Sequence, residues 1–177
     1  TFFRLMAEHG SADAALAALP ALARSAGVEQ YGACPRDDAL RELAAGRAAG
    51  ARLILSARRE EELARVAHDV ADGAGDVVTV PLDLADPASI EKAAEAVLVR
   101  PGGIDLLVNN AGLTQRALVR DAAPEVTRSL FEVNFFGPLA LSRSILPAMA
   151  EAGGGRIVVI SSIAALYSSP YRSGYNA

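Results

Sequence analysis

The chain has 177 residues, of which 51% are hydrophobic and 21% charged, with a formal net charge of −4. That length allows one domain with a sizeable core, and the composition is ordinary for a globular protein. A negative net charge without any Lys/Arg-rich block argues against nucleic acid or an anionic membrane as the main partner. The single cysteine, Cys34, excludes an intrachain disulfide, and His9 and His68 lie too far apart to suggest a metal site.

No apolar run approaches the roughly 20 residues that span a bilayer. The first residues also lack a basic region followed by an apolar one, so no signal peptide is expected. We therefore expect a cytoplasmic protein without a membrane segment.

The first 50 residues differ from the rest. An Ala-rich stretch at 12–27 predicts a helix interrupted at Pro20, and a second helix is expected to begin near Asp37 or Asp38. No convincing apolar strand precedes either helix. We expect residues 1–50 to be an atypical helical segment, not necessarily homologous to the family of the remainder, and residues 51–177 to form a partial dinucleotide-binding domain.

From residue 52 onward the chain alternates between two patterns. Short apolar runs predict strands, and stretches with an apolar stripe at helical spacing predict helices. The expected strands are 52–57, 76–83, 104–110 and 155–162, and the expected helices are 59–72, 86–98 and 124–149. Asp86 and Pro87 are typical of a helix start.

This alternation predicts βαβ units and an α/β fold with a doubly wound, Rossmann-like parallel sheet, here incomplete. The strands are almost continuously apolar, as expected when both faces of a sheet are covered. A Gly-rich phosphate-binding turn normally follows the first strand of such a domain. We find none, because the glycines of "GRAAGAR" (46–52) lead into a strand and "YGACPRDDA" (31–39) follows no strand.

Four stretches resemble the classical short-chain dehydrogenase/reductase family and occur in the same order as in that family. Within it, they are most similar to the member-7-like branch. They are "IDLLVNNAG" (104–112), "FEVNFFGPLALSRSILPAM" (131–149), "GRIVVISS" (155–162) and "PYRSGYNA" (170–177). The resemblance extends back to residue 51. A spacing of thirteen between Ser162 and Tyr175 strengthens it.

The resemblance implies a role for each matching residue. Tyr175 would be the catalytic acid/base, Ser162 would hydrogen-bond the substrate oxygen, and Asn134 would hold a water in the proton relay. The cofactor-binding residues it implies are Asn110, Ala111 and Gly112 at the adenosine ribose and Asp83 and Leu84 at the adenine ring.

Structural alternatives stand beside three of these roles. Asn134 could be an exposed or capping residue, Ser162 could simply end a strand, and Asp83 could be a turn residue before the helix that starts at Asp86-Pro87. The spacing to Tyr175 favours the catalytic interpretation of Ser162.

The end of the 52–57 strand indicates the cofactor. An acidic residue there would bind the ribose 2′-hydroxyl of NAD, whereas an arginine accommodates the 2′-phosphate of NADP. Ala57 stands at that position, followed by Arg58 and Arg59, and a guanidinium can bind phosphate with two charge-assisted hydrogen bonds. We therefore expect NADP(H), bound by Arg58. The alternative is that both arginines belong to a solvated helix face and pair with Glu61 or Glu62.

The resemblance implies hydride transfer between NADP(H) and a carbonyl or alcohol substrate. A tyrosine has an unperturbed pKa of about 10, and family enzymes lower it with a lysine four residues further on. That position would be 179, so we expect this polypeptide by itself to be inactive. The alternatives are a non-catalytic Rossmann-like protein that binds a nucleotide or a partner, and a methyltransferase of similar fold.

The long helix carries apolar residues that suit either a core or a subunit interface, and the resemblance implies a homodimer or homotetramer. These residues are Leu130, Val133, Phe136, Leu139 and Ile145.

Overall fold

The computed structural model describes residues 51–70, 76–162 and 171–176. The helices expected within residues 1–50, together with Cys34 and His9, lie outside these ranges. Within them, the predicted alternation of strands and helices is confirmed. No helix in the described ranges has the length and apolar character needed to cross a membrane.

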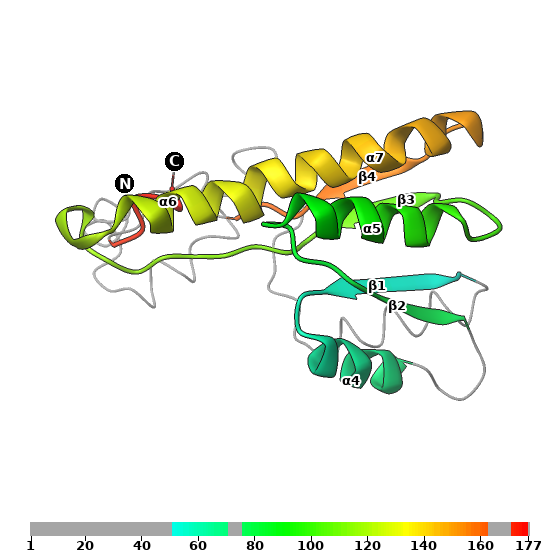
Figure 1. The fold of residues 1–177 in the computed structure, drawn as a ribbon, viewed down its shortest axis with the longest axis horizontal. Coiled ribbons are helices and arrows are strands. Elements are labelled where there is room, and N and C mark those ends of the chain that lie inside the picture. The colour runs from blue at the N-terminus through cyan, green and yellow to red at the C-terminus, as the bar shows by residue number, and fades with distance from the viewer. Residues whose placement is uncertain (1–50, 71–75, 163–170, 177) are drawn as a thin grey trace, which may run out of the picture.

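The first βαβ unit consists of β1 (Leu53–Ala57), α4 (Glu60–Val70) and β2 (Val77–Pro81), with the two strands parallel and paired from Leu53↔Val77 to Ala57↔Pro81. Three glutamates occupy the first turn of α4, where negative charge interacts favourably with the helix dipole. The helix buries Leu63 and Val70. It therefore covers one side of the strand pair, while α5 lies on the other side (Figure 1).

Helix α5 (Pro87–Leu98) begins as its sequence predicts. The Asp86 carboxylate accepts a hydrogen bond from the Ala88 N–H at 3.0 Å, and Pro87 fills the first helical position, where an N–H has no partner inside the helix. The buried face consists of Ile90, Ala93 and Ala94. The small alanines allow α5 to pack closely against α7 (Figure 1).

Strands β3 (Leu106–Asn109) and β4 (Arg156–Val159) form a second parallel pair, in register from Leu106↔Arg156 to Asn109↔Val159. Within the described ranges, this pair is not hydrogen-bonded to β1–β2. The four strands run in the same direction, so their carboxyl ends face the same side of the molecule (Figure 1).

Strand β4 corrects one expectation from the sequence. Its apolar run predicts burial on both faces, yet every residue of β4 is exposed among the described residues. Helices α5 and α7 pack with β3 through a core cluster of Ala94, Ile145 and Met149, to which Leu107 adds. No described element covers β4 in the same way. Leu106 and Val108 of β3 are exposed as well, so the expected burial of both faces is wrong for β3 too within the described residues.

The single helix predicted at 124–149 is divided into three parts: α6 (Pro124–Phe131), a π-helical turn η2 (Glu132–Phe136) and α7 (Gly137–Glu151). A π-helical turn has no clear signature in apolar periodicity, so the sequence did not predict it.

The structure also divides the apolar residues of this region into a buried and a half-exposed group. Leu130, Val133 and Ile145 are buried, whereas Phe136 and Leu139 are about half exposed, at 49% and 46%.

Gly137 marks the end of the π-helical turn and touches the loop after β2. A Cβ atom on Gly137 would lie 2.3 Å from the Leu84 carbonyl oxygen and 2.7 Å from the Leu84 Cβ. Backbone atoms cannot move aside as a flexible side chain can. Only glycine therefore allows this approach between helix and loop.

Gly137→Ala provides a test in which two effects have opposite signs. Helix propensity alone predicts stabilisation by roughly 0.5–1 kcal/mol. The contact with Leu84 predicts instead that the free energy of unfolding falls by about 1–3 kcal/mol, as for an overpacked core. Urea unfolding measures the sign, and Ala150→Gly on the exposed side of α7 reports the propensity effect in the same helix. A stabilised Gly137→Ala protein would contradict the packing argument.

Candidate functional site

Four of the predicted site residues follow the carboxyl ends of the four strands. Arg58 comes directly after β1 and Asn110 directly after β3, while Asp83 and Ser162 follow β2 and β4 within three residues. Parallel α/β proteins bind ligands outside this edge of the sheet. The topology therefore gathers residues from distant parts of the sequence on the side of the molecule where ligands are expected.

Asn134 connects the π-helical turn to the loop that follows β3. Its Oδ1 accepts a hydrogen bond from the Leu113 N–H at 2.7 Å, and its Nδ2 donates to the Leu113 carbonyl oxygen at 2.9 Å. Its Oδ1 also lies 3.4 Å from where a Cβ on Gly112 would be. Asn134 is half-buried and paired on both sides of its amide, so it is neither an exposed residue nor a helix cap.

We expect Asn134→Ala to release this loop. Loss of both hydrogen bonds should lower the free energy of unfolding by about 1–3 kcal/mol, because the Leu113 backbone groups lose their partners in a half-buried place. Amide hydrogen exchange should become faster at Leu113. Asn134→Asp is the matched control, since it keeps an acceptor for that N–H; equal exchange at Leu113 in wild type and Asn134→Ala would contradict the assignment.

The last residue of β3 is buried, and the first three residues of the loop that follows are exposed. Asn109 is only 8% exposed, and its Nδ2 donates to the Ser142 hydroxyl at 3.0 Å, which ties the strand end to α7. Asn110, Ala111 and Gly112 are exposed and accessible to a ligand. The structure thus brings this motif together with Asn134.

Asp83 and Leu84 have structural contacts in the loop between β2 and α5. The Asp83 carboxylate accepts from the Ala85 N–H at 2.9 Å, and its own N–H donates to the Ser89 hydroxyl at 2.9 Å. These bonds form the turn that leads into α5, so Asp83 does act as a turn residue. The side chain of Leu84 is buried in a cluster with Ile90 and Val133.

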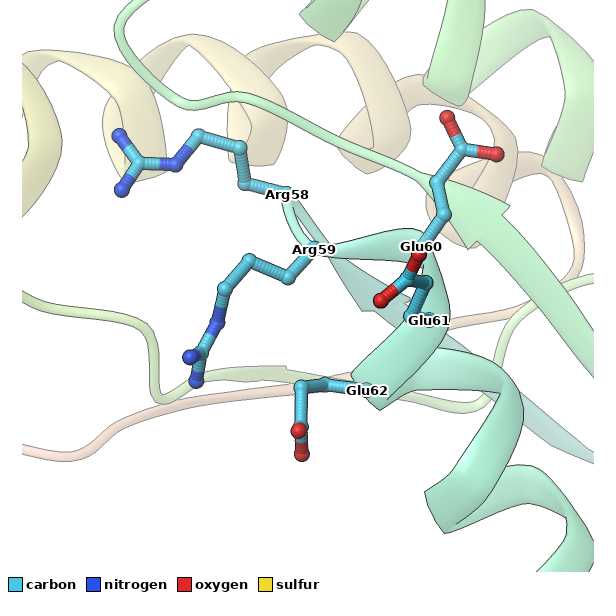
Figure 2. Close-up of a pocket in the computed structure, with 5 residues that line it drawn as sticks. All are labelled: Arg58, Arg59, Glu60, Glu61 and Glu62. Carbon is cyan, nitrogen blue, oxygen red and sulfur yellow. The ribbon is translucent and has the colours of Figure 1, made fainter.

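Arg58 and Arg59 line an open pocket after β1, together with three glutamates of the first turn of α4 (Figure 2). Both guanidinium groups extend toward the same open side, whereas the carboxylate of Glu60 points away from them (Figure 2). Glu62 pairs with Arg65. Among the described residues, neither Arg58 nor Arg59 has an ion-pair partner, so the pairing with Glu61 or Glu62 is not seen. Both side chains are exposed, as a solvated helix face would also have them.

Tyr175 belongs to a C-terminal segment, 171–176, that lies beside α6 (Figure 1). The side chain is half-buried, and the Arg172 guanidinium carbon lies 5.8 Å from the centre of its ring. The Tyr171 carbonyl accepts a hydrogen bond from the Ala117 N–H at 2.8 Å, and Tyr171 has a left-handed backbone with φ of 64°.

Gln115 contacts the segment that carries Tyr175, and the sequence did not predict this contact. It is only 6% exposed, and its Oε1 accepts a hydrogen bond from the Gly174 N–H at 3.2 Å. A glutamine in an irregular loop has no periodicity that would predict burial. Only the approach of the segment that carries Tyr175 identifies it.

The parallel βαβ architecture and the polar residues at one edge of its strands define the doubly wound, dinucleotide-binding class of α/β proteins. Residues 41–177 match the short chain dehydrogenase family. The chain belongs to this family. It is 42% identical over 136 residues to dehydrogenase/reductase SDR family member 7B of Bos taurus, covering 73% of this chain and 42% of the bovine protein.

A second relative and two solved structures support the same placement. Dehydrogenase/reductase SDR family member 7 of Homo sapiens is 42% identical over 132 residues, covering 72% of this chain and 39% of that protein. A metagenomic short-chain oxidoreductase in complex with NADP matches with a TM-score of 0.72 and 32% identity, covering 82% of this chain and 66% of the other. A short chain dehydrogenase/reductase of Burkholderia phymatum in complex with NAD matches with a TM-score of 0.69 and 27% identity, covering 77% and 50%.

These similarities place the chain in the member-7-like branch, although it spans only about two fifths of the length of the curated relatives named here. Residues 1–45 match a different family, the DprA-like N-terminal HHH domain.

Proposed function

We propose that this chain forms part of an oxidoreductase that transfers a hydride between NADP(H) and a small carbonyl or alcohol substrate. The observation that carries the proposal is the pairing of Asn134 with Leu113, directly after the exposed Asn110–Gly112 stretch. This pairing holds the loop of the cofactor motif against the helix that bears the proposed relay residue. Family membership supports the same reaction class.

In this proposal the residues divide the chemistry among them. Tyr175 donates a proton to the developing alkoxide during reduction and takes it back during oxidation. Ser162 donates a hydrogen bond to the substrate oxygen, and Asn134 holds a relay water in addition to its contact with Leu113. NADP(H), when bound, supplies or accepts the hydride.

The cofactor would lie along the carboxyl edge of the strands. Asn110, Ala111 and Gly112 would line the ribose, and the turn of Asp83 and Leu84 would meet the adenine. Since the Leu84 side chain is buried, Leu84 would contact the adenine ring through its backbone atoms.

The guanidinium groups of Arg58 and Arg59, which have no ion-pair partner among the described residues, support NADP(H) over NAD(H). Arg58 can donate two hydrogen bonds to a 2′-phosphate. Position 57, at the end of β1, is an alanine, so no carboxylate there repels the phosphate. Solved neighbours hold either cofactor, since one carries NADP and another NAD. The choice therefore depends on this chain's own residues.

Two further features extend the proposal beyond the site. The match of residues 1–45 to another family supports a separate N-terminal segment, although the short chain dehydrogenase match begins at residue 41, before the proposed division at residue 50. The half-exposed Phe136 and Leu139 support a subunit interface in a homodimer or homotetramer, since Leu130 and Ile145 of the same region are buried.

Tyr175→Phe tests the catalytic assignment. In the intact protein we expect NADPH consumption with a panel of carbonyl substrates to fall at least 100-fold, because general acid catalysis contributes about 10²–10⁴ in rate. The dissociation constant for NADPH, measured by fluorescence, should stay within about twofold, since only the hydroxyl is lost. Full turnover in Tyr175→Phe would contradict the assignment, and tight NADPH binding without turnover in the wild type would favour a non-catalytic nucleotide-binding protein.

Arg58→Ala tests cofactor choice. A hydrogen-bonded contact with a charged group contributes about 1.5–3 kcal/mol, so the dissociation constant for NADPH should rise roughly 10- to 150-fold. The dissociation constant for NADH should change little, because NADH lacks the 2′-phosphate. Arg120→Ala, which removes an exposed arginine beside Asp121, is the charge-matched control. Equal effects of Arg58→Ala on both cofactors would contradict the phosphate contact.

A further inference from the structure

The polar end of Gln115 is buried at the segment that carries Tyr175. Its Oε1 accepts the Gly174 N–H, one residue before Tyr175, while its Nε2 is buried and has no hydrogen-bond partner in the described part of the chain. An unpaired buried amide N–H costs stability, so an apolar residue of similar size would suit a purely structural position better. The hydrogen bond to Gly174 is therefore the contact that gives this buried amide a purpose in the described part of the chain.

Gly174 lies in a narrow space between Gln115 and α6. A Cβ atom on Gly174 would lie 2.7 Å from the Gln115 Oε1, 3.0 Å from the Thr127 Oγ1 and 3.2 Å from the Leu130 Cδ1. These three atoms surround the backbone from two different segments. Small shifts of Gln115 are therefore transmitted to the residue that precedes Tyr175.

A second contact fixes the start of the same segment. Ala117, two residues after Gln115, donates its N–H to the Tyr171 carbonyl at 2.8 Å and pairs with Arg172 in an isolated parallel bridge. Residues 115–117 thus hold the segment at Tyr171 and at Gly174. Tyr175 follows directly after the second of these points.

We propose that Gln115 is a positioning residue that sets the location of Tyr175 through its hydrogen bond to Gly174. This inference rests on the catalytic role proposed above for Tyr175. The Gln115 side chain itself does not take part in the chemistry. Because a misplacement of about 1 Å can cost roughly 100-fold in rate, loss of this bond should reduce the rate of the chemical step without weakening the cofactor site.

Gln115→Met tests the proposal in the intact protein. Methionine is unbranched and similar in length, but its sulfur is only a weak acceptor for the Gly174 N–H. We expect kcat for carbonyl reduction to fall roughly 10- to 100-fold while the NADPH dissociation constant stays within about twofold. The isotope effect with 4-deuterated NADPH should rise as hydride transfer becomes slower, and Arg120→Ala should leave kcat unchanged.

A double-mutant cycle separates this contact from general damage to the fold. Gly174→Ala should also lower kcat, because its Cβ would collide with the Gln115 Oε1. Gln115→Ala removes that oxygen, so the combined loss in Gln115→Ala/Gly174→Ala should be smaller than the product of the two single losses. Losses that multiply without coupling would overturn the proposal.

The outcomes distinguish this inference from the proposed function. An active wild type with unchanged kcat in Gln115→Met would overturn the positioning role and leave the proposed function intact. Full activity in Tyr175→Phe would overturn the catalytic role of Tyr175. The positioning role of Gln115 would then fall as well, because it depends on that catalytic role.

Discussion

The junction between α6 and α7 holds the site together, because two loops meet it from different strands. Asn134 holds the loop after β3 through both backbone groups of Leu113. Gly137, three residues further on, allows the loop after β2 to approach through Leu84. A continuous α-helix would present these residues at a different spacing, so the π-helical turn between them contributes to the geometry of the site.

The electrostatics of the edge differ from one strand to the next. After β1, two guanidinium groups without carboxylate partners among the described residues suit an anionic ligand. After β2, the Asp83 carboxylate already has a backbone partner in its turn. After β3 the exposed residues, Asn110, Ala111 and Gly112, carry no charge. The described part of this edge thus offers positive charge after β1 and no free cation of the same kind after β2.

The sequence predicted much of the fold because periodicity and capping are local. The Asp86-Pro87 helix start is confirmed, and the four strands appear where their apolar runs predict them. The expected burial of both strand faces was wrong for β3 and β4, because coverage of a strand depends on which helices reach it and not on its own composition. The π-helical turn and the contact between Gly137 and Leu84 were missed, since neither leaves a regular pattern in the chain.

The candidate site shows the same division. The sequence by itself determined the α/β class and the family, and it supplied the proposed catalytic residues, because residue type and spacing can be read along the chain without a structure. Only the tertiary structure decided that Asn134 binds Leu113, that the Leu84 side chain is buried and that Gln115 supports the segment of Tyr175. The two hydrogen bonds join residues that are 21 and 59 positions apart, and a hydrogen bond over such a separation depends on how the elements pack.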